Sequence, residues 1–288
     1  MLDNEILRFY NSVKDTSWPD IQDYYEFCQL PAIIKNECND MHGFQQRKQQ
    51  IVDNNYWANL FTEVCVYKNL AFLPVPKCAY VYYTTLFTNL GWEKVPLSNV
   101  DIANTQFFGT ITHPLTRWVK GIAEWILWCY KVGEEVTSDK NPWIFDQSQT
   151  VVDWPQLTLD LQTTPFKKLI STVNVGDIHS MPYSSMYGDL LDKINWIPMD
   201  ILTDNEAKIS MMNFFKLHGH DIVLPLNDKR LHVSEEGQLK LQNTVKQEFL
   251  KNKNQIYLFY HLFSHDLKFY YNLIENFTTN WQHIKTSA

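Results

Sequence analysis

This chain has few of the residues that build covalent or metal-held frameworks. It has five cysteines in 288 residues, they are scattered, and none of them forms a Cys-x-x-Cys pair. The sequence therefore predicts neither a disulfide framework nor a structural zinc site, and we expect reduced, mostly buried thiols. The histidine pairs His218/His220 and His261/His265 have no evident third ligand, so no metal site is predicted.

Long apolar runs and an excess of positive charge are also missing. No window approaches about 18 uninterrupted apolar residues, and the N-terminus lacks the apolar core of a signal peptide. We therefore expect no membrane span and no signal peptide. The net charge of −7 argues against a general nucleic-acid binder, because phosphate affinity comes from clustered Lys and Arg. These absences favour a soluble protein, intracellular or carried in a virion.

Aromatic residues, in contrast, are abundant. They make up 15% of the chain and include ten tryptophans, while the 45% of hydrophobic residues and 20% of charged residues are ordinary for a soluble globular protein. The aromatic content indicates either a heavily packed interior or an extensive contact surface. Tyr80, Tyr82, Tyr83 and Phe87 are the residues for which both interpretations stay open.

Strand and helix patterns alternate after residue 68. Strands are expected at residues 70–75, 105–112 and 196–202, and helices at 80–89, 115–130, 205–217, 235–250 and 255–277. This alternation predicts an α/β fold, with a largely parallel sheet flanked by helices. Residues 45–66 have helical spacing, so the chain is divided into a helical N-terminal extension, 1–67, and an α/β domain, 68–288.

The stretch PVPKCAYVYY, residues 74–83, places Lys77 between an expected strand and an expected helix. Backbone N–H groups and the positive end of a helix favour an anion at such a turn, and a lysine adds charge. The stretch lacks the Gly-x-x-x-x-Gly-Lys-Ser/Thr spacing of a nucleotide P-loop. On its own, a lysine that follows a strand is more often a solvated loop residue than part of an anion site.

A second strand–loop–helix pattern follows in TITHPLTRWVK, residues 110–120. Together, these two stretches resemble the sulfotransferase family, particularly its carbohydrate or Golgi-type branch and the short homologues of marine phages. DIHSMPY, residues 177–183, and the segment 256–270 are similar to two later motifs of that family. The resemblance covers about residues 68–275 and implies a P-loop-like sulfotransferase fold.

The resemblance implies a site for 3′-phosphoadenosine-5′-phosphosulfate (PAPS). Lys77, Cys78 and Ala79 match the motif that binds the 5′-phosphosulfate, with Lys77 at the transferring sulfate. The family has three hydroxyl residues next, where this chain has Tyr80, Val81 and Tyr82. Valine cannot form a hydrogen bond, and a phenol is far bulkier than serine, so the motif is degenerate.

The second motif departs from the family in a similar way. Arg117 matches, but the arginine and the serine that hold the 3′-phosphate in the family are replaced by Thr112 and Lys120. A hydroxyl and a cation remain with their places exchanged, which is consistent either with retained binding or with loss. A lysine cannot reproduce the bidentate grip of an arginine.

Sulfuryl transfer also needs a base for the acceptor hydroxyl. Residues 78–112 contain no histidine, so the candidates are His179 and Glu93. His179 is also compatible with a structural role, and Glu93 with a place on the surface.

Two functions follow from these motifs. The first is a PAPS-dependent sulfotransferase acting on a hydroxyl of a glycan or small molecule. The alternative is a catalytically inactive scaffold or binding protein, including a phage virion or accessory component in the host cytoplasm. Its aromatic surface would then contact a protein partner or a second copy of the chain.

Overall fold

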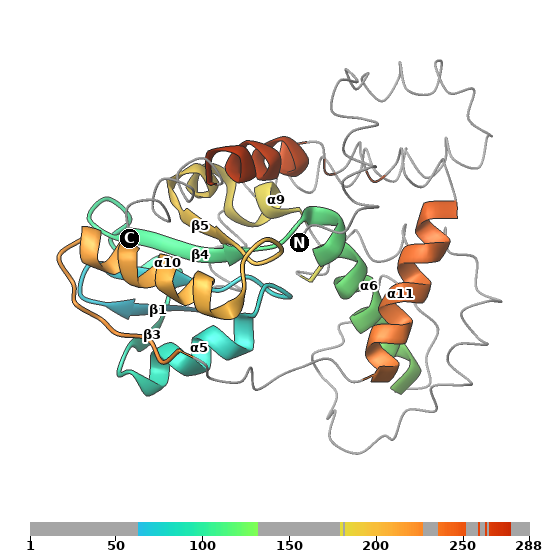
Figure 1. Cartoon of the computed structure of the whole chain (residues 1–288), viewed down its shortest axis with the longest axis horizontal. Helices are drawn as coiled ribbons and strands as arrows, with labels where there is room; N and C mark the ends of the chain where they lie inside the picture. Colours follow the sequence, from blue (N-terminus) through green and yellow to red (C-terminus); the bar gives the residue numbers. More distant parts are fainter. Residues whose placement is uncertain are drawn as a thin grey trace.

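The computed structural model describes residues 63–131, 179–180, 182–226, 236–251, 259, 263 and 265–277. The strands are β1 (Glu63–Tyr67), β2 (Leu70–Leu73), β3 (Glu93–Pro96), β4 (Gln106–Ile111) and β5 (Asn195–Pro198). The α-helices are α5 (Tyr80–Asn89), α6 (Pro114–Lys131), α9 (Tyr183–Tyr187), α10 (Asp204–Leu217) and α11 (Glu236–Lys251), followed by a helix at 265–277. Short 3-10 helices cover Leu97–Asn99 and Gly188–Lys193. The predicted α/β character is confirmed (Figure 1).

The five described strands form one mixed sheet in the order β3-β1-β2-β4-β5. β2 pairs in parallel with β4, and β4 with β5, whereas β1 is antiparallel to both β2 and β3. Since β1 alone opposes its neighbours, the other four described strands run in one direction. The expected parallel sheet is present in β2, β4 and β5, and it is extended by a mixed edge.

The two strands of that mixed edge, β1 and β3, differ from the sequence prediction. Residues 63–66 were expected to end a helix, but they belong to β1, where Val64 and Cys65 point to opposite faces of the sheet and are both buried. The sheet therefore begins at Glu63, before the predicted domain boundary at 67/68. β3 was not predicted, because Glu93–Pro96 is short, largely exposed and carries two charges. Residues 1–62 lie outside the described part of the chain.

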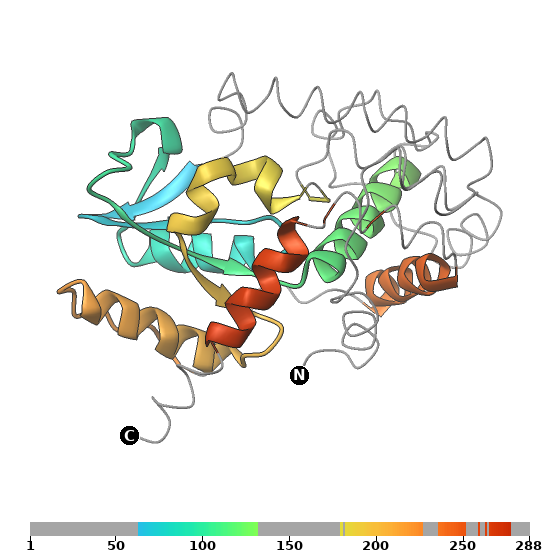
Figure 2. The ribbon, with the colours of Figure 1, turned by 90° about the horizontal axis from the view of Figure 1, so that it is seen from above.

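Helices cover both faces of the sheet (Figure 2), and each face has its own hydrophobic core. β2 is buried at every position, and its alternate residues face opposite layers. Leu70 and Phe72 belong to the core formed with α5 and α10. Ala71 and Leu73 belong to the core formed with α6, α9 and the helix at 265–277, to which α11 adds by packing against α6. A strand buried on both sides is typical of the centre of an α/β sheet. Both cores thus depend on the same short strand.

The parallel strands end together at one edge of the sheet. Leu73 of β2 pairs with Gly109, and Ile111 of β4 pairs with Pro198. A side chain at Gly109 would collide with the Leu73 carbonyl and with Trp196, both 2.9 Å from an added Cβ, so only glycine fits between these strands. The loops after β2, β4 and β5 therefore meet at the carboxyl edge, where α/β proteins commonly bind ligands.

The helices and thiols that can be compared agree with the sequence prediction. α5, α6, α10 and α11 begin within one residue of their predicted starts, and α10 opens with a capping box between Thr203 and Glu206. Cys65 and Cys78 are buried and free. Within the described residues, no helix is long and apolar enough to cross a membrane.

Candidate functional site

The loop between β2 and α5 has an unusual backbone. Lys77 and Ala79 both have left-handed conformations, with φ of 66° and 61°, and the Cys78 N–H donates to the Val75 carbonyl at 3.1 Å. Such φ values are uncommon outside glycine and carry a conformational cost. α5 begins directly afterwards at Tyr80, and no side chain caps it. The first N–H groups of a helix have no partner within the helix itself, so this loop offers backbone donors.

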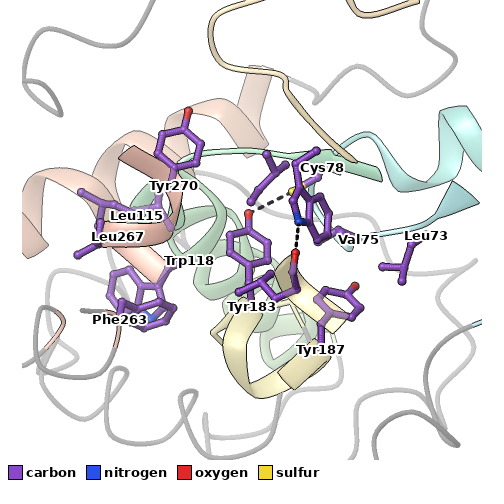
Figure 3. Close-up of a cluster of buried hydrophobic side chains, with 14 of the residues drawn as sticks. Leu73, Val75, Cys78, Leu115, Trp118, Tyr183, Tyr187, Phe263, Leu267 and Tyr270 are labelled. Atoms are coloured by element: carbon purple, nitrogen blue, oxygen red, sulfur yellow. Dashed lines mark hydrogen bonds between the residues drawn. The ribbon is translucent and has the colours of Figure 1, made fainter. Parts of the chain in front are cut away.

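The inner side of the loop is filled by side chains. The Cys78 sulfur lies 3.4 Å from the Tyr183 hydroxyl (Figure 3). It also lies 3.4 Å from the Thr112 hydroxyl. Tyr183 donates to the Thr112 carbonyl at 2.8 Å, and the Thr110 hydroxyl donates to the Cys78 carbonyl. Burial raises the pKa of Tyr183 well above its usual range, so the phenol keeps its proton and can donate. Cys78 and Thr112 thus lie together as parts of a buried network.

Arg117 of α6 contacts the same loop from the protein interior. It is 1% exposed, its Nε donates to the Pro76 carbonyl at 3.1 Å, and its guanidinium lies 4.8 Å from the centre of the Tyr183 ring. Nη2 also contacts the Met186 sulfur at 3.0 Å. A guanidinium over an aromatic face is a favourable cation–π arrangement. Arg117 therefore holds the loop in place and is not presented to solvent.

Lys77 points to α6, where it meets a carboxylate that the sequence analysis missed. Its Nζ lies 2.9 Å from Oε2 of Glu124, and Gln238 of α11 donates to the same oxygen at 3.0 Å. The side chains of Lys77 and Glu124 are 20% and 22% exposed, so both reach solvent. Glu124 could have been found from its spacing, because it stands seven residues, or two helical turns, after Arg117.

Gly121 lies between Arg117 and Glu124 on the same side of α6. An added Cβ there would lie 2.5 Å from the His179 carbonyl oxygen and 2.9 Å from the Ser180 nitrogen. Only a glycine lets these backbones approach so closely. One side of α6 therefore makes three contacts: Arg117 with the loop, Gly121 with the His179 backbone, and Glu124 with Lys77.

The start of α6 is held by a second buried polar cluster. The His113 backbone N–H donates to the Asp200 carboxylate, which also accepts from the Tyr270 hydroxyl at 3.0 Å. His113 Nδ1 accepts from the Leu115 N–H at 3.1 Å, and Nε2 lies 2.6 Å from the Tyr271 hydroxyl. Asp200 follows β5, so this cluster joins the ends of β4 and β5 to the helix at 265–277.

Burial controls the charge of this cluster. Desolvation, with a smaller effect from the charge of Lys246, lowers the pKa of His113 to about 3, so the imidazole is neutral. Burial raises the pKa of Asp200, while hydrogen bonds from His113 and Tyr270 and the charge of Lys120 act in the opposite direction. Lys120 therefore acts electrostatically on a carboxylate of the chain itself.

α9 begins at another carboxylate inside the protein. Asp266 is fully buried and accepts hydrogen bonds from the Tyr183 and Ser184 backbone N–H groups. Burial raises its pKa, and these bonds and Arg117 oppose the shift. Asp266 thereby orients Tyr183, whose hydroxyl reaches Cys78.

The structure brings together most of the predicted site residues. Lys77, Cys78, Ala79, Thr112 and Arg117 gather around the loop after β2. Two further candidates lie on or against α6: Lys120 within it and His179 beside Gly121.

Glu93 is not brought to the loop. It is exposed on β3 and pairs with Val66, which in turn pairs with Ala71 near the start of β2. Lys77 follows the other end of β2, so Glu93 lies toward the far end of the sheet.

The aromatic residues near the loop form a core. Tyr82, Tyr83 and Phe87 are buried between α5, the sheet and α10, and Lys208 lies 5.2 Å from the Tyr82 ring. These three rings do not form an exposed surface, whereas Tyr80 is half-buried. Trp118 is likewise buried, against Phe249 of α11.

Comparison of this chain with protein-family models, with curated proteins and with solved structures gives no match. Function is therefore inferred from the loop after β2 and from α6. Among the described side chains, no group of three or more His, Cys, Asp and Glu could hold a metal ion.

Proposed function

We propose that this chain is a sulfotransferase-like protein that binds the phosphosulfate end of PAPS at the loop after β2. The acceptor is a hydroxyl of a glycan or small molecule. One observation carries this proposal: two left-handed, non-glycine residues, Lys77 and Ala79, stand immediately before the uncapped helix α5. Strained backbone of this kind persists where the surrounding structure enforces it, often at ligand sites.

The loop has three features suited to an oxyanion. It supplies backbone N–H groups at the start of α5, the positive end of that helix, and the part-exposed ammonium of Lys77. Arg117 and Cys78 keep the loop in this shape from inside. These features support the proposal that the loop binds the 5′-phosphosulfate.

The residues expected at the 3′-phosphate fit less well. Thr112 is 3% exposed and engaged with Cys78 and Tyr183, and Lys120 acts on Asp200. Binding is therefore proposed to rest on the 5′ end. PAPS would supply the sulfuryl group, while Lys77 would stabilise the negative charge that develops on the departing phosphate oxygen.

The second candidate is a scaffold or binding protein without transfer activity. Two observations favour it: Lys77 is already paired with Glu124, and Arg117 is buried. An anion would have to compete with Glu124 for Lys77. The two functions differ in whether the loop binds the donor.

Titration calorimetry with the spent cofactor, 3′-phosphoadenosine-5′-phosphate (PAP), tests the proposal. We expect micromolar binding by the wild type and a loss of at least about tenfold in Lys77→Ala, because a charge-assisted contact to phosphate is removed. Lys94→Ala is the matched control. Lys94 of β3 also pairs with a glutamate, Glu63 of β1, but this pair is not part of the loop.

The control is expected to bind PAP like the wild type. Absence of heat and of thermal stabilisation at millimolar PAP would contradict the proposed function and favour the scaffold. Equal binding by Lys77→Ala would remove the loop as the site.

A further inference from the structure

Glu124 is a part-exposed carboxylate at the edge of the proposed donor site. It is carried by α6, while Lys77 comes from the loop after β2 and Gln238 from α11. Both of these partners contact the carboxylate oxygen Oε2. Among the described residues none forms a hydrogen bond or ion pair with the other oxygen, Oε1, which can therefore accept a proton or a hydrogen bond.

A hydroxyl acceptor has to lose its proton as the sulfate is transferred, and the base must lie close to the reacting group. Glu93 is too far along the sheet to serve, since it pairs beside the start of β2. His179 lies with its backbone against Gly121, one helical turn before Glu124. Of these carboxylates and imidazoles, Glu124 is the one in direct contact with Lys77.

We propose that Glu124 is the general base of the reaction, which rests on the proposed function of the loop. As the bond between the acceptor oxygen and sulfur forms, the bond between sulfur and the bridging phosphate oxygen breaks, and its electron pair stays on the phosphate. The acceptor proton passes to Oε1 of Glu124. Lys77 lies between the carboxylate of Glu124, which loses negative charge, and the bridging phosphate oxygen, which gains it.

The contacts on Oε2 suit this role. Gln238 and Lys77 fix the orientation of the carboxylate, and a fixed base needs less rearrangement during the reaction. Because the carboxylate and an incoming anion compete for Lys77, removing the charge of Glu124 is expected to leave anion binding intact or tighter. A residue that only maintained the loop would show the opposite behaviour.

The test compares Glu124→Gln with the wild type in two measurements, PAP binding by calorimetry and transfer of radiolabelled sulfate from PAPS. A phenol and free glucose serve as probe hydroxyls. The amide keeps the shape of the side chain but cannot accept the proton. We expect PAP affinity to stay equal or to rise, KM for PAPS to be little changed, and kcat to fall by about 100-fold or more.

Glu63→Gln is the matched control, because Glu63 also pairs with a lysine, Lys94, but on the strands β1 and β3. It is expected to leave both measurements unchanged. Retained transfer in Glu124→Gln overturns the proposal, as does a joint loss of PAP binding and transfer. Wild-type protein that binds PAP but sulfates neither probe also overturns it, whereas wild-type protein that does not bind PAP overturns the proposed function of the loop itself.

Discussion

The two faces of the sheet are packed in different ways. Between the sheet, α5 and α10, aromatic rings dominate, with Phe108 at distances of 5.5 and 5.1 Å from Phe72 and Phe215. On the face of α6, α9 and the helix at 265–277, the core also encloses polar groups, among them His113 and Arg117. One face is mainly apolar, and the other combines apolar packing with hydrogen-bonded networks.

This difference indicates where function is to be sought. A buried polar group costs free energy unless it is hydrogen-bonded, so a fold keeps several of them only with partners in place. Here Arg117 and Asp266 converge on the loop after β2 through Tyr183. On the other face, the buried cation Lys208 donates to the Pro225 carbonyl at 2.7 Å and lies 5.2 Å from the centre of the Tyr82 ring.

Phe108→Ala should produce the largest loss of stability. The ring is fully buried among aromatic neighbours, and its removal leaves a cavity that rigid rings cannot fill. We expect the free energy of unfolding in urea to fall by about 3–5 kcal/mol. A loss below about 1 kcal/mol would show that the aromatic face is not tightly packed, and the contrast between the faces would not hold.

His113→Asn tests the polar face through pH. The pKa of His113 is about 3 in the folded protein and about 6.5 in an unfolded chain, so the unfolded state binds the proton first. The contribution of neutral His113 to the free energy of unfolding is complete above pH 6.5 and is lost as the pH falls toward 3. Asparagine can still cap α6 but does not titrate.

We therefore expect the stability difference between wild type and His113→Asn to shrink between pH 7 and pH 4, by on the order of 3 kcal/mol. Urea unfolding of both proteins at both pH values measures this difference. The pH-dependent contributions of Asp200 and Asp266 to the free energy of unfolding largely cancel, because both proteins keep these residues. A difference independent of pH would mean that the imidazole is not buried as described.

Ala79→Gly should have the smallest effect. Glycine adopts the left-handed conformation of Ala79 without the steric cost of a Cβ, but it also gains freedom in the unfolded chain. We expect a net stabilisation within about 1 kcal/mol, seen as a small rise in Tm. A clear destabilisation would show that the backbone at Ala79 is not strained.

Much of the fold could be predicted from the sequence, because local signals mark several helix starts: a proline opens α6 and a capping box opens α10. β1 was missed since it follows a stretch with helical spacing, and β3 since it is a charged edge strand. These two strands gain their structure from pairing with each other and with β2, which no local pattern reports.

The site was predictable only in part. Lys77, Cys78 and Thr112 were found through the strand–loop–helix patterns and their resemblance to a family. Glu124 stands two helical turns after Arg117 and could have been inferred from that spacing. Asp200 belongs to no local motif, and only the folding of distant elements brings it to the start of α6. The left-handed backbone of the loop was also not predicted, because neither Lys nor Ala signals such a conformation.

A crystal structure of the protein with bound PAP tests the central claim most directly. The account predicts the 5′-phosphate within hydrogen-bond distance of the N–H groups that open α5 and of Nζ of Lys77. PAP bound elsewhere at saturating concentration, with Lys77 still on Glu124, would contradict the claim.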